Sequence, residues 1–195
     1  MQEKIAALKT HVREASANPG FIHHLWFVQW HLEIVERLSL ELLEHYPKAD
    51  RELLEVMVWL HDYGKILDFD HQYEMTLPEA RKKLQELQFP GTFVDTAVSY
   101  IAMHDNYRNM DLHTAPIEVQ ISSSADACSH FIGPFMALWW YENAYKPFEQ
   151  LMADNRHKAD KDWNLKVVLP EARKAFEGRY RLLCEQSGEL PRTFL

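Results

Sequence analysis

Apolar residues recur along most of the chain at intervals of three or four, which is the spacing of one face of an α-helix. The longest run extends from about Phe21 to Glu44 and ends before Tyr46-Pro47. Asp50 is typical of a helix N-cap for the apolar run that follows it, and Gly64 lies where that helix would end. Sustained alternation of apolar and polar residues, as expected for strands, is not visible. The pattern therefore predicts an all-α fold.

The remaining apolar periodicity predicts further helices, and short Pro- or Gly-containing turns separate them. They cover residues 77–87, 92–103, 116–141 with a bend at Gly133-Pro134, and 170–184. No internal repeat or linker divides the sequence. We expect one compact helical domain over residues 1–195, with a core over 21–141 and C-terminal helices over 146–186 packed on it.

Composition narrows the classes of function. The chain has 195 residues, of which 47% are hydrophobic and six are glycine, which is enough to bury the core of an ordinary globular domain. The net charge of −8 leaves no broad basic field, so we expect neither nucleic acid nor an anionic membrane as a partner. Oligomeric state stays open.

Cysteine usage and the N-terminal sequence bear on location. Cys128 and Cys184 lie far apart without a CxxC pair, which argues against a disulfide framework or a zinc ribbon and suits a reducing compartment. The first ten residues include charges where a signal peptide would need a long apolar run, and no apolar run reaches the length of a membrane-spanning helix. We therefore expect a cytoplasmic protein.

Eleven histidines are the one compositional anomaly, and they direct attention to metal or acid-base chemistry. His31 lies on the apolar face of its predicted helix, and His61-Asp62 lies on the interior side of a helix end. A buried carboxylate costs several kcal/mol unless a cation compensates it. Asp62 therefore requires either a metal ion or a basic partner, and Lys65 is the nearest candidate for an ion pair.

A polar stripe in a later helix supplies another carboxylate. Asp126 lies within Ile121 to His130, where serines and a histidine interrupt an otherwise apolar pattern. Two imidazoles and two carboxylates converging from three helices would form a ligand set that suits Mn, Fe, Co, Ni or Zn.

These residues stand in a recognisable order. His31, then Leu60-His-Asp-Tyr-Gly-Lys65, then Ile101-Ala-Met-His104, then Ser124-Ala-Asp126 resembles the HD-domain superfamily of metal-dependent phosphohydrolases over residues 31–126. The resemblance implies an all-α fold. It also implies that His31, His61, Asp62 and Asp126 bind one divalent transition metal, with Mg as a further candidate.

Two-metal members of this superfamily have two additional histidine ligands between the HD pair and the last Asp. His71 and His104 are the candidates here, either as ligands of a second metal or, for His104, as a phosphate contact. His71 lies in an acidic loop, and Met75 stands where the family usually has a small residue. We therefore expect one tightly bound ion.

The resemblance implies hydrolysis of a small phosphate ester, such as a nucleotide or a sugar phosphate, by metal-activated water. Asp62 would bind the metal and orient the water, and Lys65 and Arg108 would contact the phosphate. Helical spacing favours core packing over base stacking for a set of large aromatic residues, namely Trp26, Trp30, Trp59, Trp139, Trp140 and Tyr141.

Two alternatives remain. One is a di-iron oxygenase like those built on the same fold, for which His71 is the discriminating ligand. The other is a non-catalytic binding or signalling module, although such modules usually lose ligands and every core position is filled here.

Overall fold

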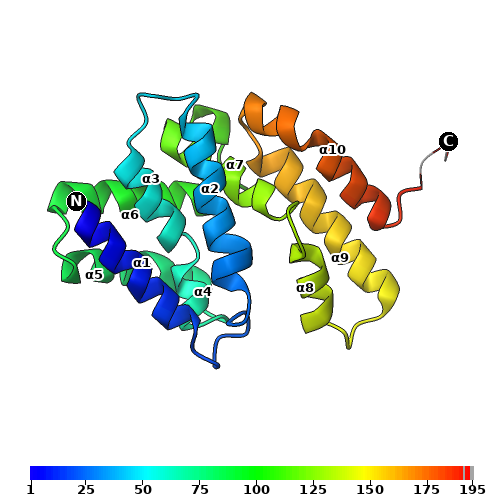
Figure 1. Cartoon of the computed structure of the whole chain (residues 1–195), viewed down its shortest axis with the longest axis horizontal. Coiled ribbons are helices and arrows are strands. Elements are labelled where there is room, and N and C mark those ends of the chain that lie inside the picture. Colours follow the sequence, from blue (N-terminus) through cyan, green and yellow to red (C-terminus); the bar gives the residue numbers. More distant parts are fainter. Residues whose placement is uncertain (191, 194–195) are drawn as a thin grey trace.

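The computed structural model describes residues 1–190, 192 and 193, and this part of the chain is helical without any strand. The all-α prediction is confirmed. The α-helices are α1 (Gln2–Ser16), α2 (Glu33–Leu43), α3 (Arg51–Leu60), α4 (Tyr63–Leu67), α5 (Gln72–Glu86), α6 (Gly91–Asp105), α7 (Ile117–Ser129), α8 (Phe135–Glu142), α9 (Phe148–Lys161) and α10 (Pro170–Gln186) (Figure 1). No helix among the described residues is long and apolar enough to cross a membrane.

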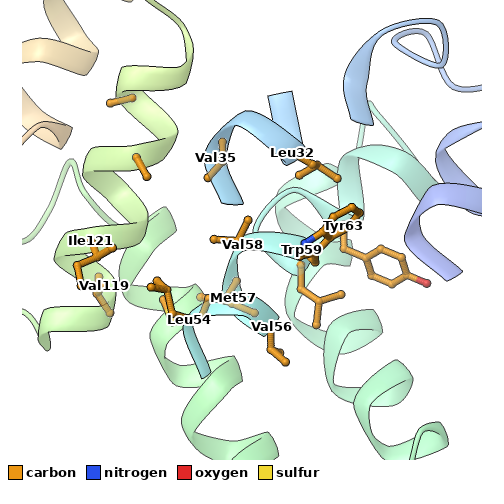
Figure 2. Close-up of a cluster of buried hydrophobic side chains, with 14 of the residues drawn as sticks. Leu32, Val35, Leu54, Val56, Met57, Val58, Trp59, Tyr63, Val119 and Ile121 are labelled. Carbon is orange, nitrogen blue, oxygen red and sulfur yellow. The ribbon is translucent and has the colours of Figure 1, made fainter. Parts of the chain in front are cut away.

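Helix α3 forms the centre of the core. It begins as predicted at Asp50, whose carboxylate accepts a hydrogen bond from the Leu53 amide at 3.0 Å. Every residue from Leu53 to Leu60 is buried, and α1, α2, α6 and α7 all pack against the helix. Figure 2 shows side chains of α3 converging with those of α2 and α7. Because α3 is fixed on all sides, the residues at its C-terminal end are rigidly placed.

The long helix predicted over residues 21–44 is interrupted. Residues 21–26 form turns, and a π-helical turn, η1 (Val28–Leu32), precedes α2. A second π-helical turn, η3 (Asp162–Lys166), follows α9. Such turns often occur at functional sites because the extra residue rotates the side chains that follow. Both carry residues that reach the site described below.

The helix predicted over residues 116–141 is also two helices rather than one bent helix. Helix α7 ends at Ser129 and α8 begins at Phe135. Gly133 between them has a φ of +61°, which other residues rarely adopt, and Pro134 has no amide hydrogen to continue a helix. The Gly-Pro pair therefore terminates the helix and redirects the chain.

Gly64 has a different role from the helix C-terminus that its position suggested. Helix α3 ends at Leu60, and Gly64 lies inside the short helix α4. A Cβ at this position would collide with the Gln72 carbonyl and with Thr76, so glycine is what lets α4 and α5 pack closely. Helix α5 begins at Gln72, five residues before the start that the sequence predicted at residue 77.

Besides the short α4, helices α1 and α9 were not individually predicted. Helix α1 buries Ile5, Leu8 and Val12 against α3 and α4. Helix α9 leads into η3, which packs against α7, and α10 contacts both α7 and α9. In Figure 1, α8, α9 and α10 lie together on one side of the molecule. The C-terminal segment thus closes one side of α7, the helix that carries Asp126.

Candidate metal centre

Three elements bring the predicted ligands together. His31 lies in the π-helical turn η1, His61 caps the end of α3, Asp62 follows it, and Asp126 lies in the middle of α7. His31, His61 and Asp126 are at most 4% exposed, and the Asp62 side chain is 19% exposed. The four residues therefore form a buried cluster that reaches solvent on the Asp62 side.

The donor atoms of this cluster lie at nearly uniform distances. His31 Nε2 and His61 Nε2 are 3.3 Å apart. Asp62 Oδ2 lies 3.4 Å from His31 Nε2 and 3.6 Å from His61 Nε2. Asp126 Oδ1 lies 3.5 Å and 3.6 Å from the same two nitrogens. These imidazole–imidazole and imidazole–carboxylate separations are those expected between neighbouring ligands about 2.0–2.2 Å from one ion, so the residues present fit a divalent transition metal.

Hydrogen bonds on the far side of each ring fix the imidazole tautomers. His61 Nδ1–H donates to the Val58 carbonyl at 2.8 Å. The Ser129 hydroxyl donates to the Asp126 carbonyl, so its oxygen accepts from His31 Nδ1–H at 3.1 Å. Both Nε2 atoms then direct lone pairs at carboxylate oxygens. With both rings neutral this arrangement is repulsive, and either a proton on His61 or a metal ion among the donors relieves it.

Two lysines compensate the carboxylates. Lys65 Nζ lies 2.7 Å from Asp62 Oδ2, and Lys166 Nζ contacts Asp126 Oδ2. Burial alone would raise the carboxyl pKa values, but the adjacent lysine charges outweigh it and hold the pKa of both aspartates well below the usual range. Both carboxylates are therefore ionised. The Lys65–Asp62 ion pair considered from the sequence is present beside the imidazoles.

His104 lies at the other side of Asp126. Its Nε2 is 3.5 Å from Asp126 Oδ2, and its Nδ1 is 3.2 Å from the Ser122 hydroxyl. Burial, together with the charge of Lys166, lowers its pKa to about 4, so this imidazole is neutral at pH 7. The next residue, Asp105, has its pKa raised to about 7, first by burial and then by the charge of Asp62.

The structure does not bring His71 into this cluster. Its side chain is 62% exposed, precedes α5, and lies 2.9 Å from Asp68 Oδ2 through Nδ1. His71 does not belong to the groups of described residues whose donor atoms lie close enough to share an ion. Arg108 is exposed and lines the outer part of the cleft described next.

The cluster lies at the bottom of a two-part cleft. An inner cavity of about 150 Å³ is lined by the four predicted ligands, His104 and Lys166. It shares Lys65, Phe135 and Lys158 with an outer cleft of about 410 Å³. The outer cleft is lined by aromatic rings and cations, namely Trp26, Phe69, Phe135, Trp139, Lys65, Arg108, Lys146, Lys158 and Lys161.

The composition of the outer cleft differs from expectation in its aromatic residues. Trp59 packs in the core as expected, being 1% exposed. Trp26 also belongs to the core, as expected, but it lines the cleft as well, as does Trp139, and the Trp26 indole donates a hydrogen bond to Glu142. The one carboxylate among the outer lining residues, Asp154, lies 2.9 Å from Lys146. The cleft therefore suits an anion that also has apolar or aromatic surface.

Sequence reasoning missed four residues at this site. His130, Lys158, Asp162 and Lys166 all contact the cluster or each other. His130 lies four positions after Asp126, so the helical period already placed both side chains on one face of α7. The other three come from α9 and η3, and no local pattern indicates that this segment folds back onto the site.

Comparison with protein-family models shows the family to which the chain belongs. The family model for the HD domain matches residues 28–130, which is more than half of the sequence and includes the four predicted ligands and His104. The segment that supplies Lys158, Asp162 and Lys166 lies outside this match. No curated protein and no solved structure matches the chain. The family match agrees with the helical fold and the His-Asp cluster, and the protein belongs to the HD-domain superfamily of metal-dependent phosphohydrolases.

Proposed function

We propose that this protein is a metal-dependent phosphohydrolase that acts on a small phosphate ester, such as a nucleotide or a sugar phosphate. The observation that carries the proposal is the position of the His-Asp cluster at the bottom of a cleft whose walls present lysines and an arginine. A phosphate group entering between these walls would reach the donor atoms of the cluster. The cofactor we propose is a divalent transition metal, drawn from Mn, Fe, Co, Ni and Zn, with Mg as a further candidate.

The charges at the site favour an anionic substrate. Lys65 already compensates Asp62, and Lys166 already compensates Asp126. A divalent ion added to this neutralised cluster would leave an excess of positive charge in a buried place. A phosphate monoester carries close to two negative charges at neutral pH and would balance that excess. The site thus matches phosphate in charge only when the metal is bound.

Each residue has a chemical role in the proposed reaction. A divalent ion held by these ligands supplies polarisation of a phosphoryl oxygen and lowers the pKa of a water molecule. Asp62, the ligand with the greatest exposure to the cavity, orients the attacking water through its carboxylate. Lys65 donates a charge-assisted hydrogen bond to a phosphate oxygen. Trp26 and Phe135 provide apolar surface for the rest of the ester.

The contacts at the site give less support to the di-iron oxygenase and to the non-catalytic module. The oxygenase hypothesis relied on His71, which lies on the surface beside Asp68. A non-catalytic module would not need two imidazole nitrogens within 3.6 Å of each other and of two carboxylates, or the cationic cleft above them. We therefore propose hydrolysis.

The test is phosphate release by purified protein that has been stripped with a chelator and reloaded with one metal at a time. A panel of nucleoside monophosphates and sugar phosphates is the substrate set. We expect metal-dependent release from some members, loss of release in Asp126→Asn, and retention in the control His71→Ala. Stoichiometric metal without release from any ester would favour the binding module, and oxygen consumption by the iron-loaded protein would favour the oxygenase.

A further inference from the structure

His130 is a buried imidazole that faces the metal cluster without having been assigned to it. Its Nε2 lies 3.5 Å from Asp126 Oδ1, the same oxygen that His31 and His61 approach at 3.5 and 3.6 Å. The rings of His130 and His31 are stacked, with centroids 5.2 Å apart and planes 5° from parallel. Three imidazoles thus present Nε2 to one carboxylate oxygen.

The other nitrogen of His130 is held by a carboxylate. Nδ1 lies 2.8 Å from Asp162 Oδ2, and Asp162 is completely buried. Lys158 Nζ lies 2.9 Å from the same oxygen and compensates its charge. An ionised carboxylate can only accept, so Nδ1 carries the proton and Nε2 carries the lone pair. Carboxylate–histidine pairs of this kind orient imidazole ligands in metal centres.

A purely structural role for His130 leaves one contact unexplained. With Nδ1 protonated, the Nε2 lone pair faces the negative Oδ1 of Asp126 across 3.5 Å. Two electron-rich atoms are therefore held in opposition in the interior, and a cation between them removes the conflict. His31 and His61 make the same approach to the same oxygen.

We propose that His130 is a further ligand of the ion bound by His31, His61, Asp62 and Asp126, and that Asp162 and Lys158 position it. The proposal rests on the metal centre of the proposed function and is independent of the reaction. Asp162 and Lys158 lie outside the matched HD domain, so the C-terminal segment would take part in building the centre. A third imidazole shifts the preference toward Fe, Co, Ni or Zn and away from Mg.

The test uses Co²⁺ as the probe, added to the full chain after chelator treatment. Affinity is measured by calorimetry for the wild type, His130→Gln, Asp162→Asn and the control His157→Gln, an exposed histidine of the outer cleft. We expect Asp162→Asn to weaken Co²⁺ binding by about 10- to 100-fold, as for other partners of metal-bound histidines, and His130→Gln to weaken it at least as much. The control should bind as the wild type does.

Paramagnetic NMR of the Co²⁺ protein gives a readout that does not depend on affinity or folding margin. Each coordinated imidazole contributes one strongly shifted, exchangeable N–H signal, and His130→Gln should lack one that the wild type and His157→Gln retain. Unchanged affinity and an unchanged set of shifted signals in His130→Gln would overturn the proposal, even if that variant released less phosphate. A wild type that binds Co²⁺ through three ligand histidines but hydrolyses no ester would support the proposal and contradict the proposed function.

Discussion

The ammonium group of Lys166 contacts Oδ2 of Asp126 in the protein interior, so the two oxygens of this carboxylate have different surroundings. Oδ2 faces a lysine, whereas Oδ1 faces the Nε2 atoms of His31 and His61. Lys166 therefore stabilises the ionised carboxylate while leaving one oxygen for the proposed metal. Because the lysine comes from η3, this contact also attaches the C-terminal segment to α7.

Replacing Lys166 with Met should destabilise the metal-free protein by about 3–5 kcal/mol, because it leaves Asp126 buried and without its partner. Bound metal would supply the missing positive charge, so the loss should be clearly smaller when the protein is saturated with Zn²⁺. Urea unfolding of the wild type and Lys166→Met, with chelator and with Zn²⁺, measures both differences. An equal loss under the two conditions would show that Lys166 does not share Asp126 with an ion.

His61→Ala and Asp62→Ala should each abolish stoichiometric metal binding and nearly all phosphate release. Both residues follow the last turn of α3, whose buried side chains and contacts with α1, α2, α6 and α7 do not depend on them. Helix content should therefore stay close to that of the wild type. Metal analysis and far-UV circular dichroism check the two statements, and a full equivalent of metal in Asp62→Ala would refute the ligand assignment.

The fold and the clustering of the four candidate ligands could be predicted because their signals are local. Helical periodicity located α3 and its Asp50 cap, and the fixed order of His31, His61-Asp62 and Asp126 indicated a shared site. These residues lie on helices whose buried faces determine where the side chains point. The family match to residues 28–130 confirms the superfamily to which this order pointed.

The rest of the site could not be predicted, because it depends on irregular backbone and on long-range packing. The π-helical turns that carry His31 and Lys166 have no periodic signature in the sequence. Asp162 looks like a solvated residue in a charged run and is instead fully buried against His130. His71 shows the converse, since its spacing from His104 suggested a ligand, whereas its neighbour Asp68 holds it at the surface.

Lys65→Ala should leave the metal bound and weaken the binding of inorganic phosphate by about 1.5–3 kcal/mol, because one charge-assisted contact is lost. The Lys65 side chain is 25% exposed and lines both parts of the cleft, so it can reach a phosphate while it remains next to Asp62. Calorimetry with phosphate and the metal-loaded protein measures the effect. Lys82→Ala, on an exposed surface of α5, is the control. If phosphate affinity stayed constant while thermal stability fell, Lys65 would serve only as the ion-pair partner of Asp62.

Metal binding should weaken as pH falls, and His61 should set the pH range. Burial lowers the pKa of His61, but the neighbouring Asp62 and Asp126 outweigh it and raise this pKa above 6.5 in the metal-free protein. A proton therefore competes with the ion below that raised pKa, with a loss of affinity of up to about tenfold per pH unit for one displaced proton. His31 has a lowered pKa and competes only at more acidic pH.

His61 should make the metal-free protein more stable at low pH, which is the opposite of its effect on metal binding. Because the folded-state pKa of His61 is raised, its contribution to stability is fully present below about pH 6.5 and is lost as pH rises through the folded value. The increase in melting temperature on adding Zn²⁺ should therefore grow between pH 6 and pH 8. Thermal unfolding at pH 6, 7 and 8 with and without Zn²⁺ tests this, and a constant increase across the series would contradict it.

The metal content of the purified protein should be about one equivalent, and His71→Ala should keep it. Lys166 Nζ and His104 Nε2 both approach Oδ2 of Asp126. A second ion bound there would be repelled by the lysine charge, and Oδ2 is already paired with that lysine. His71 lies in another direction, beside Asp68, and contributes no donor to the cluster. Elemental analysis after purification without chelator, on the wild type and His71→Ala, measures the stoichiometry. Two equivalents of iron in the wild type and one in His71→Ala would reverse this conclusion and make the di-iron oxygenase the better assignment.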